Sequence, residues 1–447
     1  MAKSKSSQHI KKPAFLYHLL YYTLRFYYQL YYRRITIIGL EKIPENNPVI
    51  FAPNHQNALM DALAVLFAVD KPLLFLARSD IFKKPIIARA LYFLRILPVY
   101  RLHDGLKSLE KNKAVFSETV QLLQNGSALT IMPEGTHSAG KQLQPLKKGT
   151  ARIAFQTAEA DGFKSPIVIV PFGIDYEHPN HAGKQLFLNV GNAISVDHYY
   201  EQYKNDPQKA IKNLTAKLQE ALKNQLIHLD DLKCEDCHRL LTKLSCSKTV
   251  LSADPQLQRF RKEQKIADQF NKLKAEQSAE LQWIITNCHQ YLSLLKTHKL
   301  HETSSKHPLP STVGLLMDSV FFLLLFPVQL YGTLVNYLPY KIPVLISNKL
   351  KDKQFISSVN FGLSFLLFPL WYVLLFVVLL LISNDWLLSM FASLSWPYAG
   401  LMAFYQYKNG RKLGNKWRWK LLSLKSPKLM LDLMRQRQTL IDWIDQL

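Results

Sequence analysis

The 447-residue chain has few acidic side chains, few cysteines and no recognisable signal peptide. Four lysines lie between positions 3 and 12, but no short apolar core with a small-residue cleavage site accompanies them. Asp and Glu number 33 against 56 Lys and Arg, which gives a formal net charge of +23. This excess of positive charge predicts an anionic partner, either a nucleic acid or an anionic membrane.

The four cysteines include one motif with known chemistry. Cys234-Glu-Asp-Cys237-His238 matches the C-x-x-C-H pattern of covalent haem attachment. Because this attachment requires export and no export signal is visible, we expect no haem. Zinc binding with the nearby Cys246 is an alternative, although the charged, helix-like surroundings favour ordinary helical cysteines. We expect no disulfide if this part of the chain is cytoplasmic.

The basic residues border long apolar runs, which favours a membrane over a nucleic acid as the anionic partner. Ten basic residues and one acidic residue, Asp432, lie between Lys408 and Arg437, directly after the last apolar run. Each such charge contributes about 1 kcal/mol to binding an anionic lipid surface. We therefore expect anionic membrane lipids as partners and no nucleic acid.

Two uncharged runs, residues 361–382 and 386–405, are long enough to cross a hydrocarbon core of about 30 Å. The two runs would form a helical hairpin. Basic residues precede it at 349, 351 and 353 and follow it at 408, 411 and 412, which predicts that both of its ends are cytoplasmic. A third run, residues 319–338, contains Pro327. If the N-terminal domain is cytoplasmic as well, the third run starts and ends on one side, so we expect it to be re-entrant or interfacial. Three spans would place either the N-terminal domain or the basic loop at 349–353 on the side that the charge distribution disfavours.

The composition divides the chain into six regions. Residues 1–33 are crowded with tyrosines, which favour the headgroup layer, so we expect an interfacial helix; the alternative is a helix packed on the following domain. The other regions are an α/β domain at 34–205, a charged helical connector at 206–300, a linker at 301–312, a membrane region at 313–410 and a basic amphipathic tail at 411–447.

Short apolar runs alternate with amphipathic stretches between residues 34 and 205. We predict strands at 35–39, 48–52, 73–77, 128–132, 167–171 and 186–190, and helices at 60–69, 85–94, 106–124 and 148–160. Strands interleaved with helices indicate an α/β fold with a mostly parallel sheet.

Four motifs lie in this domain. They are Ala-Pro-Asn-His-Gln-Asn-Ala-Leu-Met-Asp at 52–61, Leu-Pro-Val-Tyr-Arg at 97–101, Ile-Met-Pro-Glu-Gly-Thr-His-Ser at 131–138 and Ile-Val-Pro-Phe-Gly-Ile at 169–174. In this order and spacing they resemble the motifs of the glycerolipid acyltransferase family, the PlsC-like enzymes that acylate glycerol 3-phosphate or its monoacyl product. The resemblance covers roughly residues 34–200.

The first motif supplies an imidazole and a carboxylate. His55 has the chemistry of a general base for a hydroxyl, and Asp61 can accept the other ring N–H and hold the tautomer. Six positions along a regular helix would place the two on different faces. They meet only if His55 lies on a non-helical turn and the helix starts near Ala58 or later, where Asn57 could cap it. Most of the family has one residue fewer between the pair; the resemblance associates the longer spacing with glycerol-3-phosphate and dihydroxyacetone-phosphate acyltransferases.

The other motifs supply the substrate-binding candidates. A guanidinium such as that of Arg101 can hold a phosphate through two oxygens. The resemblance implies that Glu134 and Gly135, with Thr136 beside them, bind the glycerol phosphate; His137 stands where an Arg is common. Lys147 and Lys148 precede a helix whose N–H groups suit an anion. Pro171 belongs to the fourth motif, which is expected to shape the acyl pocket by packing.

The resemblance implies an acyltransferase that uses acyl-CoA or acyl carrier protein to acylate glycerol 3-phosphate in phospholipid biosynthesis. Lysophosphatidate is the alternative acceptor, and a non-catalytic membrane lipid-binding or scaffold protein is the alternative of another class. No metal or redox cofactor is implied. We expect an integral membrane protein whose catalytic domain faces the cytoplasm.

Overall fold

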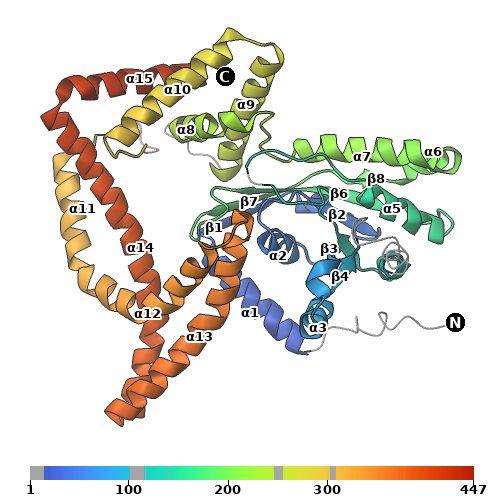
Figure 1. Ribbon diagram of the computed structural model, residues 1–447, viewed down its shortest axis with the longest axis horizontal. Helices are drawn as coiled ribbons and strands as arrows, with labels where there is room; N and C mark the ends of the chain where they lie inside the picture. Colours follow the sequence, from blue (N-terminus) through green and yellow to red (C-terminus); the bar gives the residue numbers. More distant parts are fainter. Residues whose placement is uncertain (1–14, 101–114, 116, 139, 246–254, 303–308) are drawn as a thin grey trace. The chain divides into compact units, whose positions relative to one another are not determined.

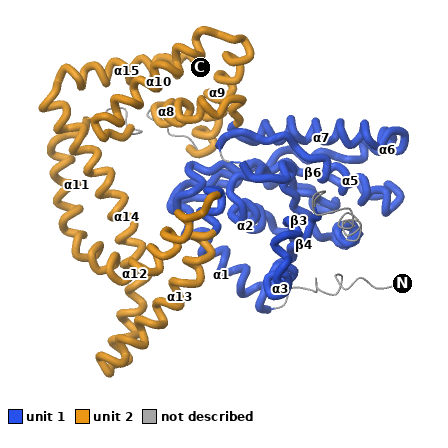
Figure 2. The backbone as a smooth tube through the Cα atoms, in the orientation of Figure 1, with its two compact units in different colours: residues 1–227, 352–358 blue, residues 228–351, 359–447 orange. Residues whose placement is uncertain are grey.

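The computed structural model describes residues 15–100, 115, 117–138, 140–245, 255–302 and 309–447 (Figure 1). The chain divides into two compact units (Figure 2). The first comprises residues 1–227 and 352–358, and the second comprises residues 228–351 and 359–447. The first unit contains the sheet and the second is helical.

The sheet of the first unit has eight strands in the order β1-β7-β6-β2-β5-β3-β4, with β8 paired to β6. Only the pairings of β6 with β7 and β8 are antiparallel among the described strands. The strands are β1 Arg34–Ile38, β2 Val49–Pro53, β3 Leu73–Arg78, β4 Ile96–Val99, β5 Ala128–Thr130, β6 Val168–Tyr176, β7 Gln185–Val190 and β8 Ile194–Ser195. The predicted α/β class with a mostly parallel sheet is confirmed.

The central strands are mostly apolar, as expected where helices cover both faces of a sheet. All five residues of β2 are buried, and so are the first seven of β6. Helices α5 (Gly149–Ala160) and α7 (Pro207–Lys223) pack on one face through a core that includes Phe155 and Leu214. Helices α1 (Phe15–Tyr31) and α2 (Leu59–Ala68) lie on the other side of the sheet (Figure 1).

Each strand predicted from the sequence is present, and its ends differ from the predicted ends by at most five residues. Helices α2, α3 (Pro85–Phe93) and α5 also match their predicted ranges. The predicted helix at 106–124 is described only in part, and its residues 117–124 are helical. Strand β4 and the short β8 were not among the predicted strands.

The first unit extends to Ile227, beyond the predicted domain end at residue 205. The reason is α7, preceded by the short helix α6 (Tyr200–Asn205). Apolar residues three or four apart, including Ala210, Leu214 and Leu218, bury one face of α7 against the sheet. Asp206 caps α7 by accepting a hydrogen bond from the Lys209 backbone N–H.

Helix α1 packs on α2, as the alternative interpretation of this region predicted. The Tyr28 ring lies 5.3 Å from the Phe67 ring, and its hydroxyl donates to the Met60 carbonyl. The outer face of α1 leaves Phe15 and Phe26 exposed. This outer face is the surface that an interfacial helix requires, and membrane contact stays a prediction.

The second unit consists of helices. Its first group contains α8 Glu235–Ser245, α9 Pro255–Ala275 and α10 Ala279–Thr297, together with the C-terminal α15 Pro427–Asp445. Trp443 of α15 stacks on Phe270 of α9 and donates its indole N–H to Glu280 of α10. The predicted C-terminal tail is therefore packed on the predicted connector.

The apolar helices of the second unit are α11 Thr312–Leu324, α12 Phe326–Ser347, α13 Ile356–Ser383 and α14 Trp386–Lys425. By length and composition, residues 353–383 and α14 could each cross a membrane. Helices α11 and α12 meet at a 49° bend at Leu325, close to Pro327. The pair is a third candidate span only if the two helices are taken as one. A Cβ on Gly332 of α12 would lie 2.0 Å from the Ala399 carbonyl of α14, so glycine permits this close packing.

An ion pair is buried among the helices of the second unit. Arg437 Nε lies 3.2 Å from Glu302 Oε1, and both side chains are more than nine-tenths buried. The Tyr291 hydroxyl donates to the other oxygen of Glu302. The carboxylate is thus held by a cation on one side and a phenol on the other.

We expect Arg437→Ala to destabilise the protein by about 3–5 kcal/mol, because it removes the cation from a buried carboxylate. Thermal unfolding of the purified protein in detergent measures the change. Lys416→Ala is the control, because its pair with Asp318 is about half exposed and such pairs contribute about 1 kcal/mol or less. Equal shifts in the two variants would contradict the prediction.

Candidate active site

His55 and Asp61 are in contact at the end of β2. His55 Nδ1 lies 2.9 Å from Asp61 Oδ2. Asp61 is fully buried, whereas the His55 side chain is 18% exposed. Since the carboxylate accepts the hydrogen of Nδ1, the tautomer leaves a lone pair on Nε2. The ring can therefore take a proton on the side away from Asp61.

Asp61 accepts hydrogen bonds from four donors. Besides His55, the backbone N–H groups of Gln56 and Asn57 donate to Oδ2, at 2.8 and 2.7 Å. The Tyr176 hydroxyl donates to Oδ1 at 2.7 Å. Tyr176 lies at the end of β6, and its distance in sequence from Asp61 explains why the motif did not reveal it. The four bonds fix the carboxylate and, through it, the imidazole.

The extra residue between His55 and Asp61 is accommodated by a turn. Residues 54–58 are not helical, and α2 begins at Leu59, as the contact required. Ala58 adopts a positive φ of 43°, which residues other than glycine rarely do. The contact between His55 and Asp61 depends on this turn.

The prediction that Asn57 caps α2 with its side chain is wrong. The Asn57 amide instead donates to the Pro179 carbonyl, at 2.9 Å. The first backbone N–H of the helix, that of Leu59, donates to Ser358 Oγ, at 3.1 Å. A serine about 300 positions further along the chain therefore provides the capping acceptor.

Glu134 lies behind His55. One carboxylate oxygen accepts from the His55 backbone N–H at 2.6 Å, and the other accepts from the Gln144 backbone N–H at 2.9 Å. The residue is 2% exposed. The resemblance implied a contact with the glycerol phosphate, but in the structure both oxygens hold backbone. Glu134 thus positions the loop that carries His55.

Four other predicted residues lie on or near the same loop. Gly135 has φ of 68°, and a Cβ there would lie 3.1 Å from Lys147 Cγ, so both backbone conformation and space favour glycine. Thr136 is exposed beside it. Lys147 and Lys148 are exposed directly before α5, whose first N–H groups suit an anion.

The two remaining predicted substrate-binding residues are Arg101 and Pro171. Arg101 lies outside the described residues. Pro171 is buried in β6, paired with Ala52 of β2, and its carbonyl accepts from the Gly191 N–H. Its position supports the predicted packing role.

His137 is next to His55. The two ring centroids are 5.4 Å apart with the planes at 89°. His137 Nε2 lies 2.9 Å from Asp352 Oδ2, and its ring also packs edge-on against Phe355. The His137 hydrogen bond lowers the pKa of Asp352. No sequence motif indicated that residues 352 and 355 would lie here.

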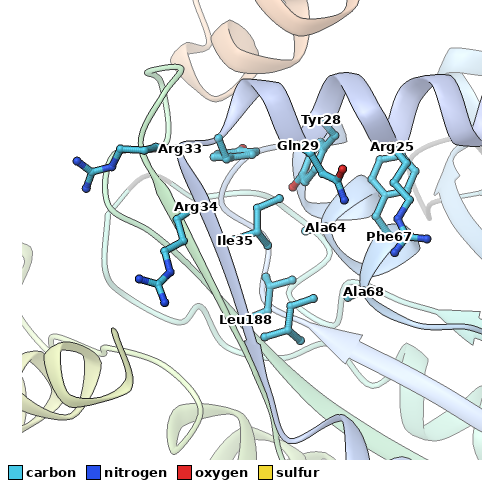
Figure 3. A pocket seen from close by; sticks show the side chains of 12 residues that line it. Arg25, Tyr28, Gln29, Arg33, Arg34, Ile35, Ala64, Phe67, Ala68 and Leu188 are labelled. Carbon is cyan, nitrogen blue, oxygen red and sulfur yellow. The ribbon is translucent and has the colours of Figure 1, made fainter. Parts of the chain in front are cut away.

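A cavity of about 310 Å³ in the first unit is separate from this site. It is lined by α1, β1, α2 and β7, and by none of the catalytic candidates. Figure 3 shows the guanidinium groups of Arg25, Arg33 and Arg34 pointing in different directions, so they do not converge on one ligand.

No group of three or more metal-ligating side chains occurs in the part of the chain that the structure describes. Cys234 and Cys237 of the C-x-x-C-H motif are buried, and Cys237 is hydrogen-bonded to Cys288. His238 Nε2 lies 2.9 Å from the Glu263 backbone carbonyl. Cys246, the third cysteine of the zinc alternative, lies outside the described residues.

We expect Glu134 to make stability depend on pH. Burial raises its pKa from 4.5 to about 7, so the folded protein retains a proton that the unfolded chain loses between these values. The free energy of unfolding therefore has its full value, as far as Glu134 is concerned, below pH 4.5. It declines by about 3 kcal/mol as the pH rises through 7. Unfolding midpoints of the wild type and Glu134→Gln at about pH 5 and pH 8 test this. The variant should show a smaller decline, and an equal decline would contradict the assignment.

Comparison with known proteins bears on the family of the first unit. The acyltransferase family model matches residues 34–175. The chain is 29% identical to the chloroplastic 1-acyl-sn-glycerol-3-phosphate acyltransferase LPAT1 of Arabidopsis thaliana, over 37% of this chain and 43% of that one. It is 25% identical to the 1-acyl-sn-glycerol-3-phosphate acyltransferase of Borreliella burgdorferi, over 36% and 59%. It is 30% identical to glycerol-3-phosphate O-acyltransferase 2 of Saccharomyces cerevisiae, over 25% and 15%.

These relatives are matched over less than two thirds of their own length. The crystal structure of the 1-acyl-sn-glycerophosphate acyltransferase PlsC from Thermotoga maritima aligns with a TM-score of 0.32 and 19% identity, over 46% of this chain and 81% of that one. An overlap at this level says nothing about the geometry of the site. The motif order, the family match and the relatives agree, and residues 34–175 form an acyltransferase domain of the glycerolipid acyltransferase family.

Proposed function

We propose that the protein transfers a fatty acyl group from a thioester, acyl-CoA or acyl carrier protein, to the hydroxyl of glycerol 3-phosphate. The observation that carries this proposal is the contact between His55 Nδ1 and the buried Asp61 carboxylate. It provides an imidazole with a fixed tautomer and a partly exposed face. The domain belongs to a family of acyltransferases, and this arrangement fits their chemistry.

In the proposed reaction, His55 Nε2 removes the proton from the acceptor hydroxyl as its oxygen attacks the thioester carbonyl. The carbonyl oxygen becomes negative in the tetrahedral intermediate. When the intermediate collapses, the C–S bond breaks and the proton on His55 passes to the leaving thiolate. The products are the ester and a free thiol. Asp61 stabilises the imidazolium between these steps, and the chemistry requires no metal or redox cofactor.

The acceptor phosphate would bind between the loop at 134–136 and the start of α5. Lys147, Lys148 and the N-terminus of α5 offer positive charge beside Gly135 and Thr136, and Arg101 belongs to the same motif set. The longer spacing between His55 and Asp61 supports glycerol 3-phosphate, or dihydroxyacetone phosphate, as the acceptor.

Lysophosphatidate is the second candidate acceptor. Two of the relatives are named as 1-acyl-sn-glycerol-3-phosphate acyltransferases. The yeast relative is named as a glycerol-3-phosphate acyltransferase. The alternative of another class is a non-catalytic membrane lipid-binding or scaffold protein, which would have no need for the His55–Asp61 geometry.

The membrane setting supports the proposal, because an acylated product is insoluble in water and belongs in a bilayer. Two helices are apolar and long enough to cross one. The basic residues at both ends of this hairpin favour a catalytic domain that faces the cytoplasm.

We expect His55→Ala to lower kcat by about a hundredfold or more, since general-base catalysis contributes about 10²–10⁴ in rate. The purified protein would be given palmitoyl-CoA or palmitoyl carrier protein with glycerol 3-phosphate, dihydroxyacetone phosphate or lysophosphatidate. His198→Ala is the matched control, because that histidine is exposed near the end of the domain.

Turnover that is fastest with glycerol 3-phosphate supports the proposed acceptor, and turnover fastest with lysophosphatidate supports the second candidate. Turnover in His55→Ala equal to that of His198→Ala would refute the mechanism. A wild type inactive with every donor and acceptor would favour the non-catalytic alternative.

A further inference from the structure

Residues 352–358 belong to the first unit, although the residues before and after them belong to the second (Figure 2). This segment, here called the strap, joins α12 to α13 and includes the first turn of α13. It follows the last of the four acyltransferase motifs by more than 170 positions in the sequence. None of the four acyltransferase motifs includes it.

The first contact of the strap is with the turn between His55 and Asp61. Ser358 Oγ accepts a hydrogen bond from the Leu59 N–H at the start of α2. Ser357 Oγ donates to the Pro179 carbonyl, which also accepts from the Asn57 amide. Both serines are nine-tenths or more buried. The strap therefore contacts the catalytic turn directly and through the loop that contains Pro179.

The second contact of the strap is with His137. Asp352 bonds to His137 Nε2, and the Phe355 ring packs edge-on against the imidazole with centroids 4.9 Å apart. His137 in turn packs edge-on against His55. The ring beside the catalytic base is thus held in place by an acidic and an aromatic residue of the strap.

The catalytic turn needs such support for a physical reason. Its extra residue leads to the positive φ of Ala58, a conformation that persists only where surrounding contacts hold it. Ala58 is the N-cap residue of α2 and its side chain makes no capping bond. Without Ser358, the helix that carries Asp61 would begin with an unsatisfied N–H in a partly buried place.

We propose that the strap completes the active site, with Ser358 and Asp352 as positioning residues for the His55–Asp61 pair and for His137 beside it. Ser358 fixes the start of α2 and with it the position of Asp61. Asp352 fixes the ring that packs against His55. This inference rests on the proposed acyl transfer, because it assigns residues to that same site.

The central test compares Ser358→Ala with Ser311→Ala. Ser311 caps α11 in the same way, by accepting from the Gly314 N–H at 3.1 Å, but it lies in the second unit. We expect Ser358→Ala to lower kcat about fivefold, the rate equivalent of one capping bond, with the KM for the acyl donor unchanged. Ser358→Thr should restore the rate, and Ser311→Ala should leave it at the wild-type value.

Asp352→Ala is a second, independent variant, and Asp385→Ala is its control. Asp385 caps α14 by accepting from Leu387 and Leu388, again in the second unit. We expect Asp352→Ala to lower kcat severalfold and Asp385→Ala to leave it unchanged. Equal effects of the two variants would overturn the role of Asp352.

Hydrogen exchange of the full-length protein provides a readout that does not depend on turnover. Peptides covering residues 55–61 should exchange faster in Ser358→Ala than in the wild type or Ser311→Ala. Unchanged exchange, or faster exchange with an unchanged kcat, overturns the proposal. If the wild type shows no acyl transfer at all, the proposed function fails. Hydrogen exchange then tests the strap contact by itself: faster exchange in Ser358→Ala supports the contact, and unchanged exchange refutes it.

Discussion

The active site depends on one fully buried carboxylate. Asp61 accepts hydrogen bonds from the His55 ring, two backbone N–H groups and the Tyr176 hydroxyl. A buried negative charge is unfavourable unless such donors surround it. The same donors fix the orientation of the carboxylate, so the cost of burial is offset by contacts that also hold the catalytic imidazole. The end of β2, the turn and the first residues of α2 are arranged around this group.

The parts of the fold that local pattern determines were predictable from the sequence. Apolar runs such as 48–52 and 167–171 predicted buried parallel strands, and the order of elements predicted the α/β class. The sequence analysis also named the condition for contact between His55 and Asp61, a non-helical turn before α2, and the structure meets this condition. The end of the domain was not predictable in this way. The sequence becomes charged and helical after residue 205, yet α7 still packs on the sheet through one apolar face.

The contacts that the sequence did not reveal are long-range. Tyr176 and Ser358 contact the region of the first motif, and Asp352 contacts His137 of the third motif. No spacing rule links residues 115 to 299 positions apart. The Asn57 cap was wrong for a related reason, because the acceptor for the Leu59 N–H is Ser358 Oγ, a residue far along the chain. Glu134 was placed at the substrate by resemblance, whereas its two oxygens support the backbone behind His55.

The central claim is that His55 and Asp61 act as one unit. The most direct measurement compares kcat for acyl transfer in His55→Ala, Asp61→Asn and the double variant at one pH. Residues that act as a unit are not additive, so the account predicts that the double variant is no slower than His55→Ala alone. Rate losses that multiply in the double variant would contradict it, because they would show that the two side chains contribute independently.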